Sequence, residues 1–185
     1  GAYGAGFLNG WTQTGTRPEF GVVTGTSTGA LIAPYAFLGS SYDHVLESMF
    51  TGIDTSDVLV DRGVAGLFGS GLTSNAPLAE MIARHVTPEL LGEIAREHEA
   101  GRRLLVATTN LDAERTAVWD MGRIAQVGTP RALEVFRKVL LASTSIPAYF
   151  PPALIEVEAG GKSCDELHVD GGAIAEIFTL PPQVL

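Results

Sequence analysis

The stretch VVTGTSTGALIA, residues 22–33, places a lone serine between two glycines where a strand is expected to become a helix. The β-branched run stops at Gly25, and the apolar stretch after Gly29 has helical character. Residues 25–29, GTSTG, match the G-x-S-x-G pattern, in which a tight strand-to-helix turn projects a serine hydroxyl from the edge of a sheet. The stretch therefore predicts an α/β domain with a candidate nucleophile at Ser27.

Each position of this pattern has a physical reason. The tight turn is expected to hold Ser27 in a strained backbone conformation, and side chains at Gly25 and Gly29 are expected to collide there. A helix that begins at Thr28 directs its free N–H groups toward the serine, so the Thr28 N–H is a candidate donor to an oxyanion. The alternative is an ordinary glycine-rich turn in which Ser27 only caps the helix.

Size and charge narrow the classes of function. The chain has 185 residues, which suggests one domain, and 45% of them are hydrophobic, which is enough for a sizeable core. The net charge of −9 argues against nucleic-acid binding and against electrostatic docking on anionic lipid, so any transient contact with a bilayer would have to be apolar. No apolar run reaches the length of a membrane span. The single cysteine, Cys164, rules out an internal disulfide and is expected to be a thiol in a loop.

Apolar patterning along the chain alternates between strand and helix. We expect helices over 2–13, 28–38, 41–49, 75–85, from Pro88 to before Gly101, and from Pro130 onward, with strands over 20–26, 103–109, 115–119, 153–157 and 167–169. This alternation predicts a layered α/β domain with a mainly parallel central sheet. Residues 51–75 are glycine-rich; they form either a lid with Leu67 and Phe68 at its apolar tip or an ordinary surface excursion.

A serine nucleophile needs a base, and two candidates lie close together in LHVDGGA, residues 167–173. His44, His85 and His98 are expected to be solvated helix positions, which leaves His168 as the one histidine in a plausible place. Asp170 is the other candidate, because Gly171 and Gly172 allow close backbone approach and unusual dihedral angles. An ordinary Asp-Gly turn explains the same residues equally well.

Several separate stretches together resemble the patatin-like phospholipase family. GTSTGALIA is similar to the family's nucleophile elbow, and VDGGAI to its D-G-[GA] motif. LASTSIPAYFPP resembles the segment that precedes that motif, ATTNLD with AVWDMG resembles paired central strands, and GAYGAGFLNGW resembles the helix after the family's glycine-rich oxyanion loop. The prolines of IPAYFPP predict a scaffold for the strand that carries Asp170 rather than a substrate contact.

The resemblance implies a three-layer α/β/α domain and a Ser–Asp dyad, with Ser27 as nucleophile and Asp170 as base. It also implies a lipid acyl hydrolase of the phospholipase A or esterase type, which cleaves carboxylic esters through an acyl-enzyme without a metal or cofactor. The family's G-G-G-x-[RK]-G oxyanion pattern departs here, because only its last glycine is present, as Gly1. We therefore expect one incomplete domain over residues 1–185, without the first strand, the oxyanion loop and the C-terminal part.

Two other functions compete with this one. The first is a Ser-His-Asp esterase that uses Ser27, His168 and either Asp112 or Asp120, although no histidine follows Asp170 in this chain. The second is a non-catalytic remnant of a hydrolase domain that binds lipid or a protein partner. A nucleotide-binding domain is weakly supported, because GAYGAG has the wrong glycine spacing and GTSTGA lacks the lysine of a P-loop.

Overall fold

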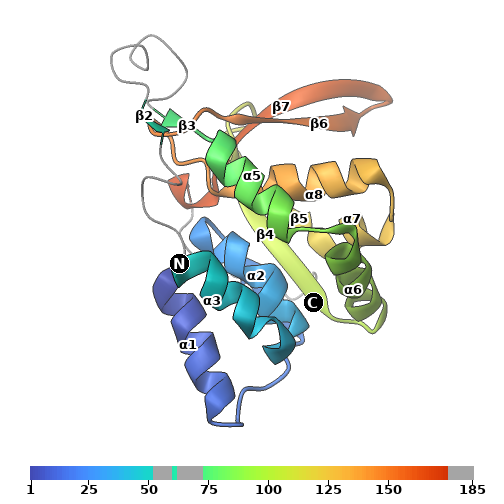
Figure 1. Cartoon of the computed structure of the whole chain (residues 1–185). Helices are drawn as coiled ribbons and strands as arrows, with labels where there is room; N and C mark the ends of the chain where they lie inside the picture. The colour runs from blue at the N-terminus through green and yellow to red at the C-terminus, as the bar shows by residue number, and fades with distance from the viewer. Residues whose placement is uncertain (52–59, 62–72, 175–185) are drawn as a thin grey trace.

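The computed structural model describes residues 1–51, 60–61 and 73–174. Figure 1 places the β6–β7 hairpin at one end of the molecule and helices α1 to α3 at the other, with strand β4 between them. The helices are α1 (Ala2–Gln13), α2 (Thr28–Leu38), α3 (Asp43–Thr51), α5 (Ala76–His85), α6 (Pro88–Glu99), α7 (Met121–Gln126) and α8 (Pro130–Ser143), with short 3-10 turns at η1 (Ser40–Tyr42) and η3 (Gly171–Ala173). The strands are β1 (Val22–Gly25), β2 (Val60–Asp61), β3 (Thr73–Ser74), β4 (Arg103–Asn110), β5 (Arg115–Asp120), β6 (Ala153–Ala159) and β7 (Lys162–Asp170).

Strand β4 organises the five-stranded sheet. Strand β5 pairs with residues 105–110 of β4 and so occupies one edge of that strand. The other edge is shared, because β1 pairs with residues 103–106 of β4 and β7 pairs with residues 108–110. Strand β6 then pairs with β7 on its far side. All but the first residue of β4 are buried, as expected of a central strand.

The predicted parallel sheet is wrong for the described residues, where the sheet is mixed. Only β1 and β4 run parallel, and the β4–β5, β4–β7 and β6–β7 pairs are antiparallel. Short connections explain two of these pairs, since residues 111–114 join β4 to β5 and Gly160–Gly161 join β6 to β7. A parallel pair needs a crossover of a dozen or more residues, which neither connection provides.

The helices pack as expected from their caps and apolar faces. The hydroxyls of Thr87 and Thr129 accept the N–H groups of Leu90 and Ala132, and a proline follows each of these caps. Helices α2, α6, α7 and α8 contact β4 and also contact one another, so they form one layer over the sheet. The described residues therefore form two layers, one of helices and one sheet. The third layer of an α/β/α domain is not among the described elements.

Some expectations need correction or extension. Helix α7 was not predicted; it begins where the Asp120 carboxylate accepts the N–H of Arg123. Strands β6 and β7 are both longer than predicted, and exposed Cys164 lies on β7 rather than in a loop. Within the glycine-rich stretch, β2 and β3 pair antiparallel. The predicted lid tip at Leu67 and Phe68 lies outside the described residues.

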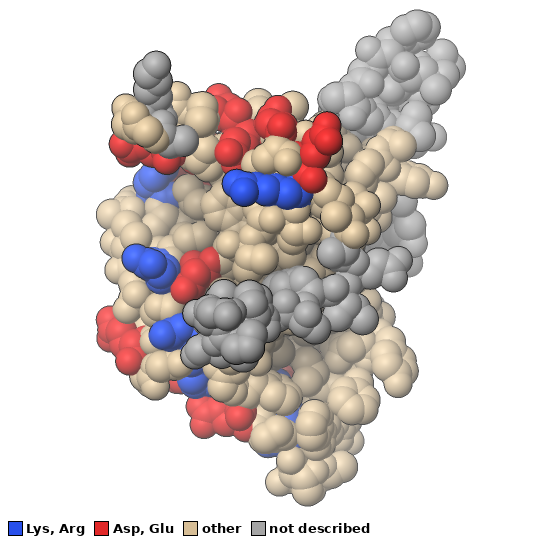
Figure 2. Space-filling view, turned by 180° about the vertical axis from the view of Figure 1, so that it is seen from behind, with Lys and Arg blue, Asp and Glu red and all other residues tan. Residues whose placement is uncertain are grey.

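A group of acidic side chains lies on the β6–β7 hairpin. Seen from behind, acidic side chains gather at the upper end of the molecule, where the hairpin lies (Figure 2). Glu156 lies opposite Asp165 in the hairpin register, and Arg131 forms an ion pair with Glu156.

In the described parts of the chain, no helix combines the length and apolarity that crossing a bilayer requires.

Candidate active site

Two strands end at the same point on the edge of β4. The last residue of β1, Gly25, lies opposite Val106, and the last residue of β7, Asp170, lies opposite Thr108. Because β1 runs parallel to β4 and β7 runs antiparallel to it, the two strands approach each other head-on. Their ends therefore meet beside Ala107, which is the one residue of β4 between the two pairing registers.

Ser27 follows β1 in a strained turn. Its backbone has φ 55° and ψ −134°, a left-handed region that non-glycine residues seldom adopt. The Ser27 hydroxyl donates to Asp170 Oδ2 at 2.6 Å, a bond that joins residues far apart in the sequence. Ser27 occupies the N-cap position of α2, but its side chain makes no capping hydrogen bond. The alternative that this hydroxyl only caps the helix is therefore wrong.

Asp170 is held by hydrogen bonds through both its backbone and its carboxylate. Its backbone N–H donates to the carbonyl oxygen of Ser145 at 2.9 Å. Its Oδ1 atom accepts the Gly172 N–H at 2.8 Å, which leaves Oδ2 for the serine. The residue is 5% exposed, so the carboxylate is largely shielded and its direction is fixed. An Asp-Gly turn is present, and the same aspartate also faces Ser27.

The glycines beside the two residues differ in how much they are needed. A Cβ atom at Gly25 would lie 2.8 Å from Ala30 Cα, and one at Gly171 would lie 2.7 Å from the Ala107 carbonyl oxygen. Both distances are shorter than real contacts, so close packing requires glycine there. No described atom lies within 4 Å of a Cβ built at Gly29, so the collision expected at Gly29 is not found. Neither Gly171 nor Gly172 has a positive φ, so the unusual dihedral angles expected there are absent.

An open cavity of about 570 Å³ holds the serine and the aspartate. Its walls include Ile146 and Pro147 besides Ser27 and Asp170; the remaining lining residues are Thr26, Gly172 and Ala173. The segment IPAYFPP therefore does more than support β7, because its first two residues line this cavity. Ala148, the next residue, has a φ of 71°, so a second strained position directly follows this part of the wall.

His168 points away from the serine. Its ring lies 5.3 Å from the Trp119 ring, centroid to centroid, and the residue is fully buried. Nδ1 lies 2.9 Å from Thr108 Oγ1, and Nε2 lies 3.2 Å from Glu166 Oε2. Because a carboxylate can only accept, Nε2 donates to Glu166 and Nδ1 accepts from the threonine hydroxyl. Burial lowers the pKa of His168, and the nearby carboxylates of Glu166 and Asp112 oppose that shift.

The other members of the alternative triad also have different partners. Asp112 accepts the Leu167 N–H at 2.7 Å, and Asp120 caps α7. His98 lies 3.6 Å from Asp120, and His44 contacts the Ser41 carbonyl oxygen. In the part of the chain that the structure describes, no histidine is hydrogen-bonded to Ser27 or Asp170. The geometry therefore gives no support to a Ser-His-Asp arrangement.

The Thr28 N–H is free to act as a donor. Thr28 is the first residue of α2, and its N–H has no acceptor among the described residues. Gly1 lies beside it, since a Cβ at Gly1 would come within 3.3 Å of Thr28 Cβ. The N-terminal ends of α1 and α2 are thus neighbours, with the dipole of α2 directed at Ser27.

Comparison with known families gives a match to the patatin-like phospholipases over residues 1–181. The chain belongs to the patatin-like phospholipase family. No curated protein gives a significant match. Family membership suggests a lipid hydrolase, and this patatin-like chain carries its serine and aspartate in one cavity. No group of three or more metal-ligating side chains occurs within residues 1–51, 60–61 and 73–174.

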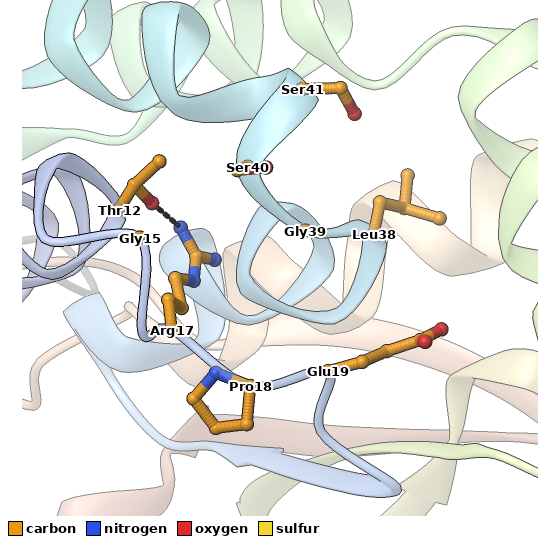
Figure 3. A pocket seen from close by; sticks show the side chains of 9 residues that line it. All are labelled: Thr12, Gly15, Arg17, Pro18, Glu19, Leu38, Gly39, Ser40 and Ser41. Carbon is orange, nitrogen blue, oxygen red and sulfur yellow. Dashed lines mark hydrogen bonds between the residues drawn. The ribbon is translucent and has the colours of Figure 1, made fainter.

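A second hollow, of about 360 Å³, lies at the opposite end of α2, around Leu38–Ser41 (Figure 3). Arg17 is its one cationic side chain and is 4% exposed. Its Nη1 donates to Asp43 Oδ1 at 2.6 Å and to Thr12 Oγ1 at 3.1 Å. The guanidinium therefore ties the end of α1 to the start of α3, and its charge is already neutralised. Among the described residues that line it, this hollow in the patatin-like chain therefore offers no free cation to a ligand.

Sequence reasoning missed the residues that hold the backbones of Ser27 and Asp170. Ser143 is the last residue of α8, and its hydroxyl accepts the Ser27 N–H. Ser145 follows the helix, and its carbonyl accepts the Asp170 N–H. They lie in the LASTSIPAYFPP segment, whose only visible signal is a run of hydroxyl residues between a helix and a proline. Such a run also occurs at ordinary helix ends, so it did not single out Ser143.

Proposed function

We propose that this protein is a lipid acyl hydrolase that cleaves carboxylic esters through a Ser27–Asp170 dyad and an acyl-enzyme. The observation that carries the proposal is the 2.6 Å hydrogen bond from Ser27 Oγ to Asp170 Oδ2 inside an open cavity. A serine hydroxyl becomes an effective nucleophile when an adjacent base takes its proton, and hydrogen-bond reach is the geometric requirement for that step. Family membership favours lipids as the substrates.

In the proposed reaction, Ser27 Oγ attacks the ester carbonyl carbon while its proton passes to Asp170 Oδ2. The carbonyl π pair moves to oxygen, and the tetrahedral intermediate then collapses to expel the alcohol, which takes the proton from Asp170. A water molecule gives its proton to the same carboxylate and attacks the acyl-enzyme. Collapse of the second intermediate releases the fatty acid and returns the proton to Ser27.

The carboxylate is prepared for this role by its hydrogen bonds. Gly172 N–H engages Oδ1, and the Ser145 carbonyl fixes the backbone, so Oδ2 keeps its direction toward Ser27 through both proton transfers. The Thr28 N–H at the start of α2 is the proposed oxyanion donor. Loss of one such donor typically costs on the order of 100- to 1000-fold in rate. The backbone beside Thr28 at Gly1 is where we expect a further donor.

The family also implies the finer architecture. We infer a three-layer α/β/α fold, of which the described residues supply the sheet and one helical layer. A catalytically silent lipid-binding remnant is the second candidate function. It is favoured because the described residues place only one free backbone donor, the Thr28 N–H, beside the serine, whereas an oxyanion hole usually has more than one donor.

A fluorophosphonate probe tests the proposal, because it labels only an activated serine. We expect the wild-type protein to be labelled at Ser27 and the Ser27→Ala variant to remain unlabelled. Hydrolysis of a short-chain p-nitrophenyl ester and of a phosphatidylcholine vesicle should be lost in the same variant. An unlabelled wild-type protein that still bound the vesicle would instead support the silent remnant.

A further inference from the structure

A buried serine at the end of α8 connects Ser27 to the central strand β4. Ser143 Oγ accepts the Ser27 N–H at 3.1 Å and donates to the Ala107 carbonyl oxygen at 2.8 Å. We propose that Ser143 is a positioning residue that holds Ser27 in its strained conformation and thereby directs the serine hydroxyl. This inference rests on the proposed function and adds a residue to it that does not itself contact substrate.

The bond to Ala107 fills a gap in the sheet. The ladder from β1 ends at Val106 and the ladder from β7 begins at Thr108, so neither strand pairs with Ala107 on this edge. A buried carbonyl without a partner is costly, and the Ser143 hydroxyl supplies that partner. The position of Ser143 is thus fixed by the central strand, and Ser143 in turn fixes Ser27.

The neighbouring hydroxyls behave differently. Thr144 Oγ1 and Ser145 Oγ donate back to carbonyl oxygens of α8, at Leu140 and Leu141. Only the Ser143 hydroxyl in this run leaves its own helix and reaches the elbow. Ser145 contributes through its backbone instead, since its carbonyl accepts the Asp170 N–H. The Ser145 side chain is therefore a matched control for that of Ser143.

Loss of the Ser143 hydroxyl has a specific chemical consequence. The Ser27 N–H and the Ala107 carbonyl would both stay buried without partners, so the strained Ser27 backbone could relax. Relaxation would move Oγ relative to Asp170 and would also turn the next peptide, which carries the Thr28 N–H. Misplacement of the reacting atoms by about 1 Å can slow catalysis strongly. Ile146 and Pro147 would still line the cavity, so substrate binding should change little. The expected loss is therefore in kcat rather than in KM.

The first experiment measures the hydrogen bond without reference to activity. Amide hydrogen exchange is followed by NMR in the wild-type protein and in the Ser143→Ala and Ser145→Ala variants. We expect the Ser27 amide to lose protection only in Ser143→Ala, while amides of β4 stay protected in all three. Equal protection of Ser27 in both variants would overturn the inference, whatever the protein's activity.

The second experiment measures the rate of fluorophosphonate labelling and the turnover of a short-chain ester. We expect Ser143→Ala to reach the wild-type labelling endpoint about 10- to 100-fold more slowly, with a matching fall in kcat and an unchanged KM. Ser145→Ala should stay within about twofold of the wild type, and Ser143→Thr should recover part of the rate. A merely structural role would lower the endpoint and the melting temperature but leave the rate per active site unchanged.

The outcomes separate the two proposals. Wild-type protein that is not labelled at Ser27 contradicts the proposed function, whereas labelled Ser143→Ala protein with the Ser145→Ala rate contradicts only the role of Ser143. Should Ser143→Ala fail to fold, Ser143→Cys takes its place, because a thiol is similar in size and hydrogen-bonds weakly. Wild-type labelling kinetics in a folded Ser143→Cys variant would equally overturn the inference.

Discussion

Ser27 and Asp170 are brought together by two strands that end head-on at the same edge of β4. Gly25 marks the last pairing of β1, and Asp170 is the last residue of β7. The contact between the two side chains therefore depends on the register of three strands rather than on a flexible loop. A site built on strand ends in this way is held more firmly than one built on loops.

The proposed dyad makes a direct prediction for Asp170. Asp170→Asn removes the proton acceptor but keeps the shape, so ester hydrolysis should fall by roughly 100- to 10,000-fold. His168→Gln should keep at least a tenth of wild-type turnover, because the ring faces Thr108 and Glu166 instead of Ser27. Turnover per labelled site is the measurement. The reverse ranking of the two variants would favour a histidine as the base.

The two glycines of the elbow should differ in their tolerance of alanine. Gly25→Ala places a Cβ against Ala30 and Ala33, so the elbow must distort, and both stability and turnover should fall sharply. Gly29→Ala meets no described atom and lies within α2, where alanine favours the helix by roughly 0.5–1 kcal/mol. Thermal melts and labelling rates measure both effects. Similar destabilisation by the two variants would contradict this view of the turn.

The glycines after the aspartate form a second matched pair. A Cβ at Gly171 would strike the Ala107 carbonyl, which is backbone and cannot move aside, so Gly171→Ala should be destabilised by about 1–3 kcal/mol. A Cβ at Gly172 would lie 3.1 Å from Asp170 Oδ1, which requires only a small shift of the carboxylate. Gly172→Ala should therefore fold normally and lose mainly turnover. Urea unfolding and ester hydrolysis, measured on both variants, separate the two expectations.

The sequence predicted the local elements of the site well, because each depends on residues close in the chain. The Gly25–Gly29 turn, the helix from Thr28 and the caps at Thr87 and Thr129 follow from turn chemistry and capping. The sheet direction was predicted wrongly, since alternation of strands and helices cannot reveal that β7 returns antiparallel along the edge that β1 occupies. Strand pairing is a long-range property that periodicity does not encode.

The supporting residues were hidden for a similar reason. Ser143 contacts Ser27 because α8 ends beside Ala107, and nothing near Ser143 in the sequence indicates that position. Gly29 shows the opposite error, since the motif suggested a collision that the described atoms do not produce. A motif can indicate candidate reactive residues, whereas the packing decides which neighbours hold them.

The cavity wall predicts selectivity for the acyl chain. Ile146 is 45% exposed and lines the cavity, so Ile146→Trp should narrow the space beside Ser27. We expect hydrolysis of long-chain esters to fall more than that of acetate or butyrate esters. Leu154→Trp is the control, because Leu154 is similarly exposed on β6 but does not line the cavity. Equal effects on short and long chains would remove Ile146 from substrate selection.

The buried histidine predicts how stability depends on pH. Burial lowers the pKa of His168, and Glu166 and Asp112 oppose this only in part, so the folded protein favours the neutral ring. Below the ordinary histidine pKa of about 6.5, the unfolded chain then binds more protons than the folded one. Stability is therefore complete above about pH 6.5 and should decrease as the pH falls through the lowered pKa of His168.

The measurement is the free energy of unfolding in urea between about pH 5 and about pH 8. His168→Gln should flatten the slope between about pH 5 and pH 6.5, because the glutamine cannot titrate. His85→Gln should flatten it less, since burial also lowers the pKa of His85 but its ring is only partly buried. If the free energy of unfolding kept the same slope against pH in His168→Gln, other groups would carry the pH dependence. Protonation of the ring beside Trp119 and Thr108 would then cost the folded state little.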